Sequence, residues 1–114
     1  MKYALLIYSS ETAGAFERLS EEEQNTVMGE YFAISELAGT FGGAQLQPAT
    51  TATTVRVEDG RTLTTDGPFA ETKEVLGGFY LFEAGDLDKA LEVAARIPAA
   101  RMGGVVEVRP LVER

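Results

Sequence analysis

The first residues of the chain show the pattern of a strand that is covered on both faces. Residues 2–8 are apolar on either side of an extended chain, with Tyr3, Leu5 and Ile7 on one side and Ala4, Leu6 and Tyr8 on the other. A strand with one solvated face would alternate apolar and polar residues instead. The pattern therefore predicts a central strand over residues 2–8.

A helix is predicted to begin after Ser20. Ser20 and Glu23 have the spacing of a capping box, in which the serine caps the helix and the glutamate reaches back to it. Apolar residues then recur at intervals of three and four: Val27, Met28, Tyr31, Phe32, Ile34, Leu37 and Ala38. We expect this stripe to pack on the sheet. The helix should end at Gly39 or at the Gly42-Gly43 pair.

The middle of the chain predicts a hairpin. Residues 53–58 and 61–65 are rich in β-branched side chains and flank Asp59-Gly60, which is typical of a two-residue type I′ turn. Such a turn pairs Glu58 with Arg61. The other, more apolar face then carries Val55, Val57, Thr62 and Thr64, and Asp66 joins it if the pairing runs one residue further.

Further strands and a second helix are predicted on either side of the hairpin. Residues 43–50 suggest a short edge strand that Pro48 ends. Residues 75–83 form a strand that is apolar on both faces. Asp86 caps a helix that Pro98 closes, with apolar positions at Leu87, Ala90, Leu91, Ala94 and Ile97. Residues 105–110 alternate and end at a proline, as an edge strand would.

This order predicts an α+β fold over one domain, residues 1–114. It corresponds to a ferredoxin-like βαββαβ arrangement with an inserted hairpin. Two helices can cover only one face of the sheet, yet strands 2–8 and 78–82 carry apolar side chains on both faces. Because a large apolar sheet face is rarely left in water, we expect a homodimer that packs sheet face to sheet face, a dimeric α/β barrel.

The composition excludes several kinds of chemistry. The chain has no cysteine, histidine or tryptophan, which removes disulfides, cysteine nucleophiles, histidine bases and zinc sites built from Cys or His. With 18 acidic and 10 basic residues the net charge is −8, which disfavours nucleic acid and anionic membranes as partners. We expect a cytoplasmic protein, because no run approaches the length of a membrane span and the start does not resemble a signal peptide.

Residues 66–74, Asp-Gly-Pro-Phe-Ala-Glu-Thr-Lys-Glu, form the densest motif of the chain. Together with Gly77-Gly78-Phe79-Tyr80 they resemble the signature of the YCII-related, DGPF-domain family. The resemblance extends to the opening strand, residues 46–57, residues 97–101 and the closing strand, and so covers essentially the whole chain. It implies a dimeric ferredoxin-like barrel, and a stress or signalling context. In the wider superfamily a His-Asp pair is taken as the active site, and of that pair this chain has only Asp66.

Asp66 has two interpretations. At the inward end of a strand it could act as a general acid or base. The more common role of Asp-Gly-Pro is a turn, in which the aspartate accepts backbone N–H groups, Gly67 tolerates unusual dihedral angles and Pro68 fixes its own φ. We also expect Phe69 to anchor the loop by burying its ring, and Gly77-Gly78 to mark a β-bulge or a close approach.

Three further residues are candidates for ligand binding. Lys73 could hold an anionic ligand, although a solvated or ion-paired lysine is the commoner case. Tyr8 and Tyr80 could each donate a hydrogen bond to a ligand if their strands are adjacent, although aromatic residues on central strands more often belong to a core or an interface. The acidic residues match no metal loop, so we assign no metal and no cofactor.

Two functions remain open from the sequence. The first is a non-catalytic module that binds a small molecule or a partner in a stress or signalling pathway, which the lack of histidine favours. The alternative is a small-molecule enzyme in which Asp66 works as acid or base in a cleft of the barrel. Whether the protein is an enzyme is left undecided by the residues alone.

Overall fold

The computed structural model describes residues 1–10 and 14–114. The elements follow the order β1 (Lys2–Ser10), α1 (Glu21–Ser35), β2 (Thr40–Gln45), η1 (Ala49–Thr51), β3 (Thr53–Glu58), β4 (Arg61–Asp66), β5 (Glu74–Glu83), α2 (Leu87–Ala94), η2 (Pro98–Arg101) and β6 (Val105–Pro110). No helix in the described part of the chain has the length and apolar character needed to cross a membrane.

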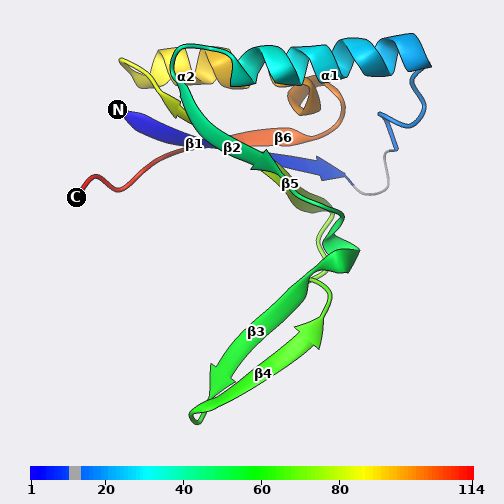
Figure 1. Cartoon of the computed structure of the whole chain (residues 1–114), viewed down its shortest axis with the longest axis vertical. Helices are drawn as coiled ribbons and strands as arrows, with labels where there is room; N and C mark the ends of the chain where they lie inside the picture. Colours follow the sequence, from blue (N-terminus) through cyan, green and yellow to red (C-terminus); the bar gives the residue numbers. More distant parts are fainter. Residues whose placement is uncertain (11–13) are drawn as a thin grey trace.

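Four strands form the main sheet in the order β2-β5-β1-β6, and every neighbouring pair is antiparallel. The fold is α+β, as predicted, and this strand order is compatible with a ferredoxin-like arrangement. β1 is central and β6 lies at an edge, so both of these predictions are confirmed. Both helices lie on one side of the sheet, and the separate hairpin β3–β4 lies on the other side (Figure 1).

The core lies between the helices and the sheet. Tyr3, Leu5 and Ile97 are at most 1% exposed there, and Ile34 of α1 and Val93 of α2 pack into the same cluster. On β1 the residues that point to the helices alternate with residues of the opposite face, which are only partly buried. A single chain therefore covers one face of its sheet and leaves the other uncovered.

Helix α1 begins as predicted and ends earlier. The Ser20 hydroxyl accepts the Glu23 N–H at 3.1 Å, and the Glu23 carboxylate accepts the Ser20 N–H at 3.2 Å. The helix ends at Ser35, before the predicted stop at Gly39. A Cβ at Gly39 would lie 2.5 Å from the Glu83 carbonyl oxygen, so this glycine serves the close approach of the chain to β5 rather than the helix end.

The predicted apolar stripe of α1 is too broad. Val27 and Ile34 are buried and Tyr31 is partly buried, whereas Phe32 is 66% exposed and Met28 is also exposed. Helix α1 therefore contacts the sheet through a narrower stripe than the sequence suggested.

Helix α2 shows a similar shift of its buried face. The Asp86 carboxylate caps it by accepting the Lys89 N–H at 2.9 Å, as predicted. Its buried residues are Ala90, Val93 and Ala94. Leu87 and Leu91, which were expected in the core, are exposed, because α2 turns the side with Ala90, Val93 and Ala94 to the core.

The hairpin has the predicted turn and register. Asp59 and Gly60 both have positive φ, 50° and 74°, as a type I′ turn requires. Glu58 pairs with Arg61, and the pairing extends to Thr53 and Asp66. The edge strand expected over residues 43–50 is instead β2, which spans Thr40–Gln45 and includes the Gly42-Gly43 pair.

We use the term open face for the side of the main sheet that carries no helix. It is formed by alternate residues of three adjacent strands, paired as Leu6 with Phe79, Ala4 with Leu81 and Tyr8 with Val105. These side chains are only partly buried or are exposed. The prediction that β1 is covered on both sides is therefore not met within one chain.

Candidate functional site

A cleft lies between α1 and the end of the sheet at which β2 runs on toward the hairpin. Its volume is about 980 Å³, which is in the range of sites that hold small molecules. Residues of α1, β2 and β5 form most of its lining. The end of β1, residues 14–17, residues 46–49 and the three residues Ala99, Met102 and Gly104 complete it. The cleft is open to solvent on one side.

Glycines of two adjacent strands shape this cleft. Gly78 of β5 pairs with Gln45 of β2, and Gly43 of β2 pairs with Tyr80. A Cβ at Gly78 would lie 2.9 Å from the Ala44 carbonyl oxygen, and one at Gly43 would lie 2.6 Å from the Phe79 carbonyl oxygen. The close approach of the strands thus requires glycine, and the missing side chains leave room beneath α1.

Gly77 has a different role from Gly78. Ile7 pairs with Gly78 and Tyr8 pairs with Leu76, so Gly77 is the additional residue of a β-bulge. The bulge was predicted from the glycine pair and is confirmed. A Cβ at Gly77 would lie 3.7 Å from the Ser9 hydroxyl and 4.0 Å from the Ile7 carbonyl oxygen, which are ordinary contact distances, so this position has space for a methyl group.

Two tyrosines stand at the boundary between the cleft and the core. The Tyr80 hydroxyl donates to the carbonyl oxygen of Tyr31 at 2.8 Å, which connects β5 to α1. Burial raises the pKa of both phenols above the usual value of 10.0. Both side chains are therefore neutral at physiological pH, and they contribute polar but uncharged groups to the lining.

Other hydroxyl groups of the cleft also donate to the backbone of α1. The Thr40 hydroxyl donates to the Ile34 carbonyl at 2.7 Å, and the Ser35 hydroxyl donates to the Phe32 carbonyl at 2.5 Å. A hydroxyl has one donor and two acceptor positions. Since the donors are used, these hydroxyl oxygens have only lone pairs to offer to a ligand, and they act as acceptors.

The lining is nearly free of charge. Glu17 is the only acidic or basic residue among the described residues of the cleft. Phosphate and carboxylate groups are normally held by arginine, lysine or several backbone N–H groups. The cleft therefore suits an uncharged molecule, and its aromatic and aliphatic side chains suit one that is largely apolar.

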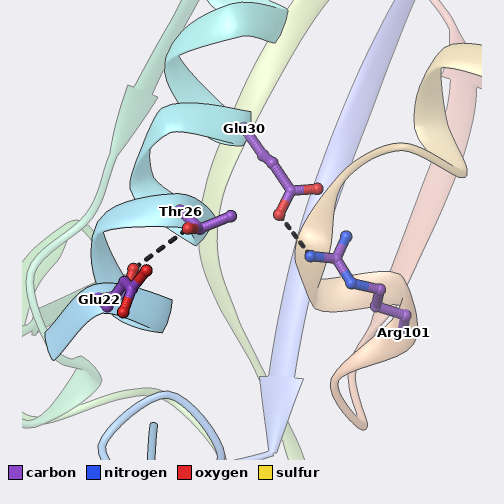
Figure 2. Close-up of polar contacts among 4 residues, drawn as sticks. All are labelled: Glu22, Thr26, Glu30 and Arg101. Carbon is purple, nitrogen blue, oxygen red and sulfur yellow. Dashed lines mark hydrogen bonds and ion pairs between the residues drawn. The ribbon is translucent and has the colours of Figure 1, made fainter. Parts of the chain in front are cut away.

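An ion pair fixes α1 beside the cleft. The Arg101 guanidinium of η2 donates to the Glu30 carboxylate at 2.5 Å, and one turn earlier the Thr26 hydroxyl donates to the Glu22 carbonyl at 3.1 Å (Figure 2). Both charged side chains are partly exposed, so the pair contributes at most about 1 kcal/mol. It connects two walls of the cleft, since Ala99 and Met102 next to Arg101 belong to the lining.

Asp66 lies outside this cleft. It is the last residue of β4, pairs with Thr53 and is exposed. Its carboxylate makes no hydrogen bond in the described part of the chain. The turn is closed by other groups, because the Gly67 N–H donates to the Ala52 carbonyl at 2.7 Å and the Thr54 hydroxyl donates to the Gly67 carbonyl at 2.8 Å. Gly67 has a φ of 94°, which agrees with its expected freedom.

The predicted ligand residues do not meet in one chain. Lys73 is exposed and forms no ion pair with any residue of the described ranges. Tyr8 points to the open face, whereas Tyr80 is hydrogen-bonded to α1 on the other face. Of Asp66, Lys73, Tyr8 and Tyr80, only Tyr80 lines the cleft. The functional roles of the other three stay predictions.

The expected burial of Phe69 is wrong for the single chain. Its ring is 78% exposed. The loop that follows Pro68 runs along the base of the projecting hairpin, where the chain offers no core for the ring to enter (Figure 1).

The sequence interpretation missed most of the cleft. Tyr31 packs against the core, as predicted for the stripe of α1, and also lines the cleft, whereas the sequence pattern did not indicate Thr40 or Ser35. The strand was expected to end at Tyr8, but β1 continues to Ser10 and brings Ser9 to the cleft. The signal that could have indicated the cleft is the pair of glycine runs, Gly42-Gly43 and Gly77-Gly78, which lie in the adjacent strands β2 and β5.

The acidic residues form no recognisable metal site. Within residues 1–10 and 14–114, no group of three or more Asp or Glu side chains is placed to hold a metal ion.

The comparisons with known proteins agree on one family. The sequence pattern of the YCII-related domain matches residues 1–114. An uncharacterized protein of Rhizobium meliloti (strain 1021) is 43% identical over 116 residues, an alignment that covers 97% of this chain and 92% of that protein.

Proposed function

We propose that this chain, which belongs to the family of YCII-related domains, is a binding module for an uncharged, largely apolar small molecule. The observation that carries the proposal is the cleft beneath α1. It has the volume of a small-molecule site, an apolar and aromatic lining and a single charged residue, Glu17, among its described residues. We further propose a stress or signalling context, on the family resemblance alone.

The arrangement of hydroxyl groups narrows the chemistry of the ligand. Thr40, Ser35 and Tyr80 all donate to carbonyl groups of α1, so they meet a ligand as acceptors. The matching ligand carries hydroxyl or N–H groups on an apolar frame. The exposed amides of Gln45 and Gln47 at the cleft can supply donors for a carbonyl of the same ligand.

A neutral dye such as Nile red, whose fluorescence rises in apolar surroundings, tests this proposal. Ser35→Trp places an indole in the cleft and should weaken dye binding by about tenfold, the effect expected from losing a few apolar contacts. Ala33→Trp is the matched control, because Ala33 is an exposed residue of the same helix and does not line the cleft. Equal binding by both variants would contradict the proposal, as would tighter binding of an anionic dye.

The geometry gives no support to the alternative of an enzyme that uses Asp66. That residue does not line the cleft and its carboxylate meets no partner within the described residues. A general acid or base must come within hydrogen-bond reach of the group that it serves. We therefore retain binding as the proposed function.

We also propose that two copies of the chain associate through their open faces. The apolar pairs Leu6–Phe79 and Ala4–Leu81 lie at the centre of this face without a helix over them. Two sheets that pack face to face are separated by about 10 Å, which leaves room for one interdigitated layer of side chains. A two-fold axis through the face would bring each residue against the same surface of the partner.

Leu6→Arg tests this association, because it places a charge at the centre of the open face. The variant should run as a monomer in sedimentation experiments. Ala38→Arg adds the same charge at an exposed position after α1. This variant should sediment with the same oligomeric mass as the native protein. A Leu6→Arg variant with native mass would refute association through this face.

A further inference from the structure

The hairpin β3–β4 is a projecting arm. The Cα radius of gyration of the chain is 16.1 Å, whereas a compact domain of this length has about 13 Å. The hairpin accounts for the excess, since it extends from the end of the sheet and away from both helices (Figure 1). At its base, the Gly67 N–H donates to the Ala52 carbonyl at 2.7 Å, so the arm is closed where it leaves the sheet.

The two faces of the arm differ in character. One face carries Thr54, Arg56, Glu58, Arg61, Leu63 and Thr65, which is a mostly polar set. The other carries Val55 and Val57, 60% and 67% exposed, opposite Thr64 and Thr62. A two-stranded hairpin without a covering layer is marginally stable in water. The valine face therefore leaves apolar side chains in water unless another surface covers it.

The place of the arm indicates what covers it. The arm lies on the side of the sheet that has no helices, which is the side of the open face (Figure 1). Each of its strands has six residues, a length of roughly 20 Å, about twice the spacing between two packed sheets. A second copy that packs on the open face would therefore lie beside the arm, and the arm would extend past the partner's sheet.

We infer that the hairpin is a docking arm that packs its valine face, Val55 and Val57, against a second copy of this chain. The inference rests on the proposed association through the open faces. By two-fold symmetry each copy extends one arm and receives one. The open face and the valine face are then two parts of one continuous interface, and the exposed apolar surface of both is explained by the same partner.

Removal of the arm is the first test. Residues 53–66 are replaced by an Asn-Gly turn, which can join Ala52 to Gly67 because these residues are already hydrogen-bonded. Circular dichroism should show that the remaining sheet and helices fold. Analytical ultracentrifugation should show a dimer dissociation constant raised by about 100-fold or more, since apolar contacts of four valines are lost from the complex.

Two point variants show whether the valine face itself, rather than the deletion in general, changes the dimer dissociation constant. Val57→Asp adds a negative charge on the valine face and should raise the dissociation constant by about tenfold or more. Thr65→Asp adds the same charge on the opposite face of the same hairpin and should leave it within about threefold of the native value.

The outcomes separate the two proposals. If the native chain is a monomer at micromolar concentration, both the association and the arm are refuted. If the native chain is a dimer and the deletion and Val57→Asp dimerise as tightly as it does, the arm inference fails while the open-face association stands. If Thr65→Asp weakens the dimer as much as Val57→Asp, the assignment of the valine face is wrong.

Discussion

The two faces of the main sheet are built from the same strands and have different surroundings. On the helix-covered face, Tyr3 and Leu5 of β1 are enclosed by side chains of α1 and α2. On the open face, Leu6 and Phe79 pair across the same two strands with no layer above them. Apolar surface left in water costs about 25 cal/mol per Å². The difference shows that one face completes the fold of the chain, and it supports the proposal that the other face associates with a second copy.

The cleft lies mainly on the covered face, where it interrupts the packing. Toward β6 the side chains of Leu5, Ile97 and Val93 fill the space beneath the helices. Toward β2, Gly43 and Gly78 leave the sheet without side chains, and the space is open. The same layer of helices thus stabilises the fold at one side and forms the wall of the cleft at the other.

The largest expected effect is the difference in free energy of unfolding between a leucine truncated in the core and one truncated on the surface. Leu5→Ala should lower the free energy of unfolding by about 3 kcal/mol, because the side chain is fully buried and leaves a cavity. Leu91→Ala removes the same atoms from the exposed flank of α2 and should cost no more than about 1 kcal/mol. Urea denaturation measures both values, and equal losses would show that the core is assigned wrongly.

A second contrast separates the two adjacent glycines. Gly78→Ala should cost about 1–3 kcal/mol, because its Cβ would meet the Ala44 carbonyl at 2.9 Å and force β2 and β5 apart. The Cβ of Gly77→Ala has no neighbour nearer than the Ser9 hydroxyl at 3.7 Å, so this change should alter stability by less than about 0.5 kcal/mol. Thermal unfolding of the two variants gives the comparison. A Gly78→Ala chain as stable as the native one would contradict the described strand approach.

The smallest expected effect concerns the tyrosines between cleft and core. Burial raises the pKa of Tyr31 and Tyr80, so the folded chain keeps these phenols neutral where the unfolded chain already ionises them. Their contribution to stability is complete below pH about 10, the value of a free phenol, and is lost as the pH rises through the folded pKa values. Denaturation midpoints from pH 9 to 12 measure this loss.

The matched control for the pH dependence is the double variant Tyr31→Phe/Tyr80→Phe. It removes both phenols and should show a shallower decline of stability between pH 10 and 12 than the native chain. Identical slopes would mean that the two tyrosines titrate as they do in the unfolded chain.

Local rules predicted the elements that depend on neighbouring residues. The Ser20 and Asp86 caps, the type I′ turn at Asp59-Gly60 and the hairpin register are all confirmed, because each is decided within a few positions of sequence. The α+β class followed from the order of these elements. These features needed no knowledge of distant contacts.

Predictions that depended on tertiary contacts were less successful. Phe32 and Leu91 fit a helical stripe but lie outside the narrow contact with the sheet. Tyr8 and Tyr80 lie in adjacent strands, as expected, and yet on opposite faces. The cleft forms where Gly43 and Gly78 have no side chains. Sequence motifs are defined by the side chains that are present, so they did not indicate this space.

The native mass in solution tests most directly whether the open face and the arm are interfaces. Sedimentation equilibrium of the unmodified chain at micromolar concentration should give twice the 12.3 kDa of one chain, because neither apolar surface is covered within a single copy. A mass of 12.3 kDa at every concentration up to the micromolar range would contradict this account.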